Sequence, residues 1–148
     1  MAPWEAVQAV NKALCQAQKM DPLNSAKGYE SGRRLWEKSF EKFMSLPEAL
    51  DVCRSCHELG PFTFNNGNTF AAIGRTMVEE QLKAVPPVEA QILRTTMCHY
   101  IVGLIGRKEL EQVLRHFELL LSANPAAARA ATEPARITPA PREQRATA

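Results

Sequence analysis

The helical spacing of apolar residues is the feature of this sequence that most constrains its fold. Between residues 4 and 122, large apolar side chains recur every three to four positions, and only the short run PFTF at 61–64 weakly suggests a strand. Such spacing predicts amphipathic helices that each bury one face. The sequence therefore predicts an all-α fold, a single compact bundle of about five or six short helices.

Prolines, glycines and capping residues predict where these helices begin and end. The predicted helices cover residues 4–20, 25–45, 47–59, 69–84, 88–105 and 107–122. Ser45 and Glu48 have the spacing of a capping box, and Pro47 suits the first turn of the helix that follows. Asn68 or Thr69 is the expected cap of the fourth helix.

Two further details of this prediction concern the second and fifth helices. Trp36, Phe40 and Phe43 share one apolar stripe of the second helix, the face expected to pack against the bundle. Gly106 is expected to end the fifth helix in the left-handed conformation that favours glycine. Both expectations depend on local sequence alone.

Composition changes once along the chain, at residue 124. The segment that follows contains Ala, Pro, Thr, Arg, Glu, Gln and Asn, with Ile137 as its single large apolar residue. Such a segment buries too little apolar surface to offset the entropy lost on ordering. We therefore expect a helical domain at 1–123 and a disordered Ala/Pro/Arg-rich tail at 124–148.

Charge and hydropathy narrow the choice of partner and compartment. The formal net charge of +2 comes from interspersed basic and acidic residues, which makes a nucleic-acid partner unlikely on electrostatic grounds. The first residues lack the basic and apolar regions of a secretory signal, and no apolar run approaches the ~18 residues that a membrane span needs. We expect a cytoplasmic protein whose four cysteines are reduced and which does not enter a membrane.

The run CRSCH at 53–57 is the main candidate site. In a helix, Cys53, Cys56 and His57 stand at positions i, i+3 and i+4 and share one face, so two thiols and an imidazole can converge. A haem, a zinc ion and a redox-active dithiol each use this set of groups.

The CxxCH spacing resembles the haem attachment site of c-type cytochromes, over these five residues only. The resemblance implies that Cys53 and Cys56 form thioether bonds to a haem and that His57 is one axial ligand. The distal ligand would be Met77, Met97 or His99. A chain of this kind would be a monohaem electron carrier.

The same cysteines also form half of a possible zinc site. Cys53 and Cys56 have the C-x2-C spacing of zinc modules. The remaining ligands would come from His57, Cys98 and His99. Cys98 and His99 are adjacent on one predicted helix, so about 100° of rotation separates their side chains.

A third interpretation is dithiol redox chemistry. Eleven residues separate Glu41 from Cys53, and with the CxxC this spacing resembles the pattern of the alkylhydroperoxidase D/carboxymuconolactone decarboxylase-like family. The resemblance implies an all-helical peroxidase that uses Cys53, Cys56, Glu41 and a histidine. That family's histidine lies four residues after the second cysteine, where this chain has Gly60, so His57 is the nearest substitute.

A purely structural role also fits the cysteines, because cysteine packs as a small apolar residue. Taken together, these observations favour a small intracellular helical interaction or regulatory module that binds a protein partner or self-associates. A metal site or thiol redox switch at the CRSCH helix is compatible with that role. The alternative is a cofactor protein or enzyme, and the sequence favours the non-enzymatic interpretation without deciding it.

Overall fold

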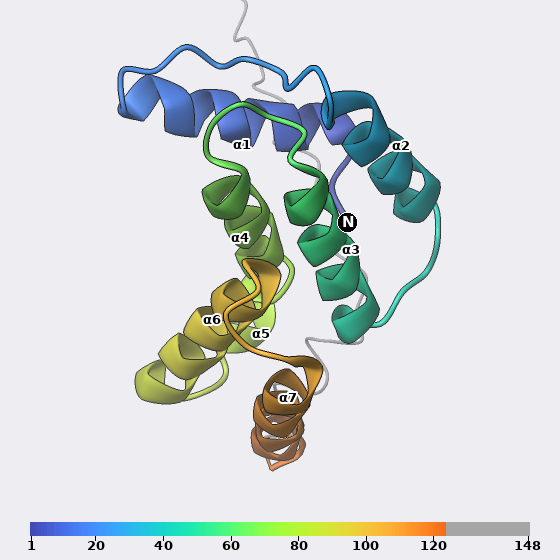
Figure 1. The fold of residues 1–148 in the computed structure, drawn as a ribbon. Coiled ribbons are helices and arrows are strands. Elements are labelled where there is room, and N and C mark those ends of the chain that lie inside the picture. Colours follow the sequence, from blue (N-terminus) through green and yellow to red (C-terminus); the bar gives the residue numbers. More distant parts are fainter. Residues whose placement is uncertain (124–148) are drawn as a thin grey trace, which may run out of the picture.

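The computed structural model describes residues 1–123, which fold into seven helices joined by short connections (Figure 1). The helices are α1 (Trp4–Ala17), α2 (Tyr29–Phe40), α3 (Leu46–Leu59), α4 (Asn66–Thr76), α5 (Glu79–Leu82), α6 (Pro87–Ile101) and α7 (Arg107–Ser122). The only β-type pairing within residues 1–123 is an isolated bridge between Asn24 and Phe62. The predicted all-α fold is therefore confirmed, whereas the predicted tail at 124–148 lies outside the described residues.

The antiparallel pair α3 and α4 forms the centre of the bundle. Helix α3 packs against α2, α4 and α6, and helix α4 packs against α1, α3 and α6. Figure 1 shows α1 lying across one end of this pair, while α7, which packs against α6, lies at the opposite end of the molecule. In residues 1–123, no helix has the length and apolar character needed to cross a membrane.

Helix α3 carries the candidate cysteines, and both of its ends are formed as local sequence predicts. The Ser45 hydroxyl accepts a hydrogen bond from the Glu48 backbone N–H, and the Glu48 carboxylate accepts one from the Ser45 N–H at 2.8 Å. This capping box satisfies two backbone donors that a helix start otherwise leaves unpaired. Gly60 ends the helix with a φ of 61°, in the left-handed region.

Two glycines bring α2 unusually close to the last turn of α3. A Cβ added to Gly28 would lie 2.0 Å from the Leu59 carbonyl oxygen, and one added to Gly32 would lie 2.9 Å from the Pro61 Cβ. Real Cβ atoms do not approach other heavy atoms so closely, so both positions require glycine for the observed packing. This contact covers the cysteine-bearing part of α3.

The second helix is shorter than predicted, which changes the position of Phe43. Helix α2 ends at Phe40, and residues 41–45 form a connection in which Ser45 is extended. The chain must leave the helix before Ser45, because an N-cap residue cannot have helical dihedrals. The prediction that Phe43 belongs to the buried stripe is wrong, since its side chain is fully exposed.

The predicted helix at 69–84 is two helices, α4 and α5, and it starts earlier than predicted. The Asn66 side chain hydrogen-bonds to both the backbone N–H and the carbonyl of Phe62, which anchors the start of α4. Asn65, with a φ of 62°, takes the cap position in place of Asn68 or Thr69. The chain turns after Thr76, so Val78 and Leu82 both reach the core.

Gly106 does not end α6 as predicted. The helix ends at Ile101, and the glycine with positive φ is Gly103, at 83°. Gly106 is extended and precedes α7, where its N–H donates to the Glu109 carboxylate at 3.1 Å. The residue that reverses the chain lies three positions earlier than expected because α6 stops before residue 102.

Candidate functional site

Cys53 and Cys56 lie in the core of the bundle, with no exposed surface. The Cys56 thiol lies 3.7 Å from the Gly32 carbonyl oxygen, to which it donates, so it packs at the close contact between α2 and α3. Burial raises the pKa of both thiols to about 12. Because metal binding and nucleophilic attack require thiolates, this environment opposes both at neutral pH.

His57 is only partly buried and contacts a different part of the bundle. A Cβ added to Gly67, at the start of α4, would lie 3.7 Å from the His57 Nε2. The Nδ1 of His57 is buried without a hydrogen-bond partner. The Cys56 thiol therefore faces α2 while the imidazole lies beside α4, so the two groups contact different helices.

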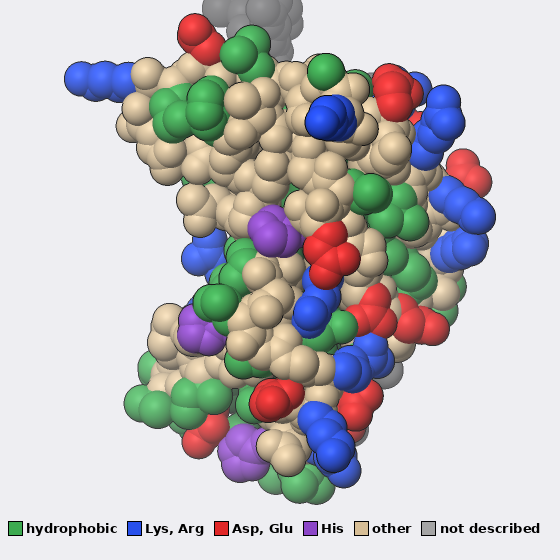
Figure 2. Space-filling view, viewed as in Figure 1, with side chains coloured by type: hydrophobic (Ala, Val, Ile, Leu, Met, Phe, Trp, Pro, Cys, Tyr) green, Lys and Arg blue, Asp and Glu red, His purple; other side chains and the backbone are tan. Residues whose placement is uncertain are grey.

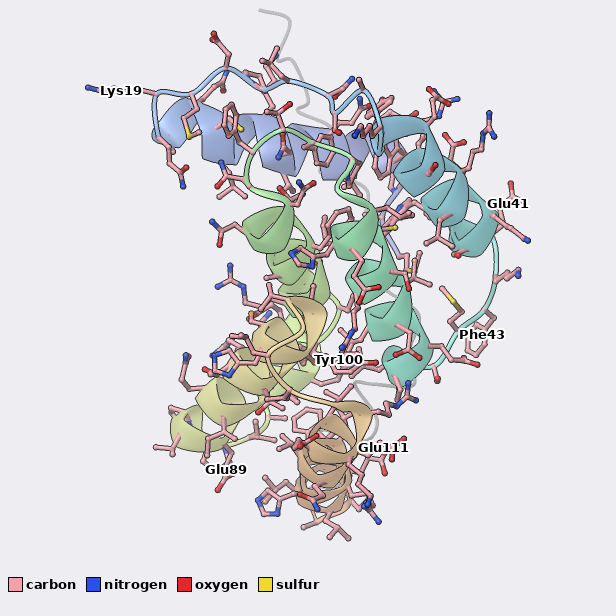
Figure 3. All side chains as sticks on the ribbon, in the orientation of Figure 1. Lys19, Glu41, Phe43, Glu89, Tyr100 and Glu111 are labelled. Carbon is pink, nitrogen blue, oxygen red and sulfur yellow. The ribbon has the colours of Figure 1, made fainter. Side chains whose placement is uncertain are left out.

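The other predicted ligands lie at separate places. Met97 is fully buried in α6, Cys98 is partly buried and His99 is exposed. Met77 is partly buried at the end of α4. Glu41 lies at the outer end of α2 and points away from the bundle (Figure 3). Within residues 1–123, no three His, Cys, Asp or Glu side chains are grouped as a metal site.

The haem, zinc and dithiol interpretations therefore remain predictions that the observed packing does not favour. Each of them requires a ligand, an ion or a peroxide to reach thiols that α3 buries against its neighbours. What the geometry does support is that these cysteines act as small core residues at a close helix contact.

A polar cluster beside the cysteine face connects three helices. The Asp51 carboxylate accepts hydrogen bonds from the Tyr100 hydroxyl and the Arg107 guanidinium. The Arg54 guanidinium lies 4.7 Å from the centre of the Tyr100 ring and donates to the Ile105 carbonyl at 3.0 Å. Tyr100 is near the end of α6, and Figure 3 shows it where α6 comes close to α3 and α7. Burial, followed by its bond to Asp51, raises the pKa of Tyr100.

This cluster is a structural joint. It ties the connection at 102–106 to α3 and so fixes where α7 begins. Each charged group in it has a partner, and Tyr100 is almost completely buried. These groups therefore orient α7, and the surface that α7 helps to form is the second candidate site.

An apolar groove of about 200 Å³ lies between the start of α3, the end of α4, α5 and α7. We call it the α7 groove. Its apolar walls are formed chiefly by Leu46, Pro47, Met77, Leu114, Phe117 and Leu121. Next to it is a second hollow of about 330 Å³, the Phe43 pocket, which includes Lys42, Phe43 and Met44. The two share Leu46, Met77 and Gln81, so they form one continuous surface.

Two features distinguish this surface from an ordinary gap between helices. The Oε1 of Gln81 is buried and has no hydrogen-bond partner, although a buried amide oxygen normally has one. Phe43 stands at the edge of the molecule on the loop between α2 and α3, with its side chain fully exposed (Figure 3). An unpaired acceptor and an exposed aromatic ring thus adjoin the same groove.

Sequence reasoning missed this surface. The sequence places Phe43 on a buried stripe and Met77 either among the apolar residues of the fourth predicted helix or as a distal haem ligand. The available signal was the capping box at Ser45, because a helix that starts there forces the preceding residues out of α2. The walls of the groove, however, come from segments far apart in the chain, such as those of Leu46 and Leu121. No local sequence pattern indicates that such segments are neighbours in the fold.

Charge on the molecular surface is mixed. In the face shown in Figure 2, basic and acidic side chains alternate, and no large area carries a single sign. On the continuous surface formed by the two hollows, Lys42 lines the Phe43 pocket and Glu118 lines the α7 groove. The two ends of this surface thus have opposite charges.

Comparison with known proteins finds no matching protein-family model, no matching curated protein and no matching solved structure. The resemblances to c-type cytochromes and to the alkylhydroperoxidase D-like family therefore rest on their short motifs alone. Any functional conclusion has to be drawn from the geometry of this chain.

Proposed function

We propose that this protein is a helical interaction module that binds a protein partner through Phe43 and the α7 groove. The observation that carries the proposal is the fully exposed Phe43 beside an apolar groove. Single exposed apolar residues are common on protein surfaces, but contiguous apolar surfaces mark interaction sites. Here the aromatic ring and the groove are continuous through Leu46 and Met77.

The size of the α7 groove suits a side chain better than a small-molecule substrate. Its volume of about 200 Å³ lies below the ~300 Å³ at which typical ligand pockets begin. An apolar cavity of about 150 Å³ holds a benzene ring, so the groove has room for one aromatic or aliphatic anchor. Protein interfaces derive much of their affinity from such anchors in apolar pockets.

The unpaired Gln81 oxygen supports the same proposal. Leaving a buried acceptor without a donor costs about 1–3 kcal/mol. Gln81 lines both hollows, so a rotation of its amide on binding brings this oxygen to an N–H or ammonium donor of the partner and removes the cost. An apolar groove that takes up anchor side chains is the mode by which many proteins bind a helix.

The proposed compartment is the cytoplasm. The four cysteines are free thiols, and such thiols persist in reducing compartments. The thiols are not part of the proposed binding surface, because Cys53 and Cys56 are enclosed by the core.

Site-specific photo-crosslinking in the cells that make the protein tests the proposal. A benzoylphenylalanine in place of Phe43 is expected to form a discrete adduct with a partner protein. The matched control places the same group at Leu104, which is also strongly exposed but lies outside the groove. Equal adduct formation at positions 43 and 104, or none at either, would contradict the proposal.

A second pair of variants tests whether the groove takes part. Leu121→Lys places a charge in the α7 groove and is expected to abolish the adduct formed from position 43. Leu119→Lys introduces the same charge on the same helix, at an exposed residue that does not line the groove, and is expected to leave the adduct unchanged. If both variants behave alike, the groove is not the binding site.

A further inference from the structure

We infer that the partner at this surface is a second copy of this chain, with Phe43 of each copy inserted in the α7 groove of the other. The inference rests on the proposed function and names its partner. It follows from three properties of the surface: the positions of Phe43 and the groove, the size of the groove, and the charges at its two ends.

The first property is that Phe43 and the α7 groove lie on the same face of the molecule. A symmetric dimer contact uses the same patch on both subunits, so that patch must contain both members of each contact. Phe43 lines the pocket that shares Leu46, Met77 and Gln81 with the α7 groove. A twofold axis through these shared residues places each Phe43 over the groove of the other copy.

The second property is the fit of an aromatic ring. The α7 groove encloses about 200 Å³ and its walls include Leu114 and Phe117. Phe43 is the only large apolar residue of the described chain whose side chain is completely exposed. Insertion in the groove removes this ring from water and fills the cavity, which are the two changes that make an aromatic anchor favourable.

The third property is charge complementarity. Lys42 precedes Phe43, and Glu118 lines the groove. Within residues 1–123, neither side chain forms an ion pair. The twofold arrangement brings Lys42 of each copy toward Glu118 of the other, so the charges that stay apart in one chain attract between two.

The chain's own residues 124–148 are the competing occupant. That segment contains one large apolar residue, Ile137, and no aromatic residue. Occupation of the groove by this segment gives Phe43 no apolar site to enter. A second copy accounts for both the exposed ring and the open groove.

Sedimentation equilibrium of the purified full-length chain tests this inference. The wild-type chain is expected to dimerise at about micromolar concentrations, as small interfaces do. Phe43→Ser removes both ring contacts of the dimer, and Leu121→Lys blocks both grooves. Since one anchor contact contributes roughly 30-fold to affinity, each variant is expected to weaken the dimer by roughly 1,000-fold. Leu104→Ser and Leu119→Lys, which alter exposed residues elsewhere, should leave the dimer unchanged.

Sedimentation of a mixture of the two weakened variants is the most discriminating part of the experiment. In a mixed dimer, Phe43 of the Leu121→Lys chain meets the intact groove of the Phe43→Ser chain, so one of the two contacts is restored. The mixture is expected to dimerise roughly 30-fold more tightly than either variant alone. Absence of any gain on mixing overturns the inference, as does a Phe43→Ser chain that dimerises like the wild type.

The outcomes also separate this inference from the proposed function. A wild-type chain that stays monomeric at about 100 μM, well above the micromolar range, overturns the second copy as partner. If the position-43 crosslink then joins another protein, the proposed function stands and only the identity of the partner is wrong. A crosslink to residues 124–148 of the same chain, or no crosslink, contradicts both.

Discussion

The two ends of α3 present two apolar regions with different surroundings. At the start of the helix, Leu46 and Pro47 line an open groove, whereas further along Cys53 and Cys56 are completely enclosed. Both regions are built from apolar and weakly polar side chains, so composition does not separate them. The difference is that neighbouring helices cover the cysteines and leave the groove open. The cysteines therefore fit a packing role, and the groove is accessible to a partner.

The enclosed end depends on the approach of α2. Gly28 and Gly32 allow the backbone of α2 to reach the last turn of α3. Only a small side chain fits at such a contact, and Cys56 fills the space while its thiol donates weakly to Gly32. The comparison therefore predicts that substitutions at this end change stability, whereas substitutions at the groove change association.

The largest effect on stability is expected from Gly28→Ala. The added Cβ would lie 2.0 Å from the Leu59 carbonyl oxygen, and backbone atoms cannot move aside cheaply. We expect a loss of about 3 kcal/mol in the free energy of unfolding, measured by urea denaturation followed by circular dichroism. The exposed neighbour Lys27→Ala serves as the control and should change stability by less than about 0.5 kcal/mol. A Gly28→Ala protein as stable as the wild type would show that α2 is not held close to α3.

An effect of intermediate size is expected at alkaline pH. Burial raises the pKa of Cys53 and Cys56 to about 12, whereas the ordinary pKa of a cysteine thiol is 9.0. Above the lower value the unfolded state loses protons that the folded state keeps, so stability is complete well below about pH 9 and falls between about pH 9 and 12. At about pH 9.5 the two thiols together should cost about 2 kcal/mol.

Urea denaturation at about pH 7 and about pH 9.5 measures this loss. The double variant Cys53→Ala, Cys56→Ala lacks the titrating groups and provides the control, because all other groups titrate in both proteins. The wild type should lose about 2 kcal/mol more than the double variant. An equal loss in both proteins would mean that the thiols are accessible to solvent, which would restore the metal and redox interpretations.

The smallest effect on stability is expected from Tyr100→Phe, in the joint that orients α7. The substitution removes the hydrogen bond to Asp51, whose carboxylate keeps Arg107 as a partner. We expect a loss of about 1 kcal/mol in urea denaturation. A double-mutant cycle with Arg107→Gln should show that the two contacts are coupled. Independent effects of the two substitutions would mean that the cluster does not act as a unit.

Local sequence predicts most of the helices because helix ends depend on neighbouring residues. The capping box at Ser45 and the left-handed Gly60 involve groups within four positions of one another, so the pattern alone identifies them. The predicted end of the second helix is five residues too late. The apolar periodicity continues past Phe40, but Ser45 must be extended to cap α3, so the chain leaves the helix earlier. That one error hid the exposed position of Phe43.

The candidate sites depend on contacts between distant segments, which one sequence does not reveal. The capping box at Ser45 correctly indicates the helix that carries Cys53 and Cys56. Their complete burial depends on neighbouring helices, as the contact of Cys56 with Gly32 shows. The α7 groove likewise brings together residues near 46, 77 and 121. A motif identifies which groups are neighbours along a helix and leaves open what the rest of the fold places over them.

Sedimentation equilibrium of two variants, measured in parallel, shows whether the groove end of α3 serves association and the cysteine end serves packing. The first variant is Phe43→Ser and the second is Cys53→Ala, Cys56→Ala. We expect the cysteine variant to remain a dimer with wild-type affinity, and Phe43→Ser to be a monomer that stays folded. A dimer that survives Phe43→Ser and is lost in the folded cysteine variant would reverse these two roles.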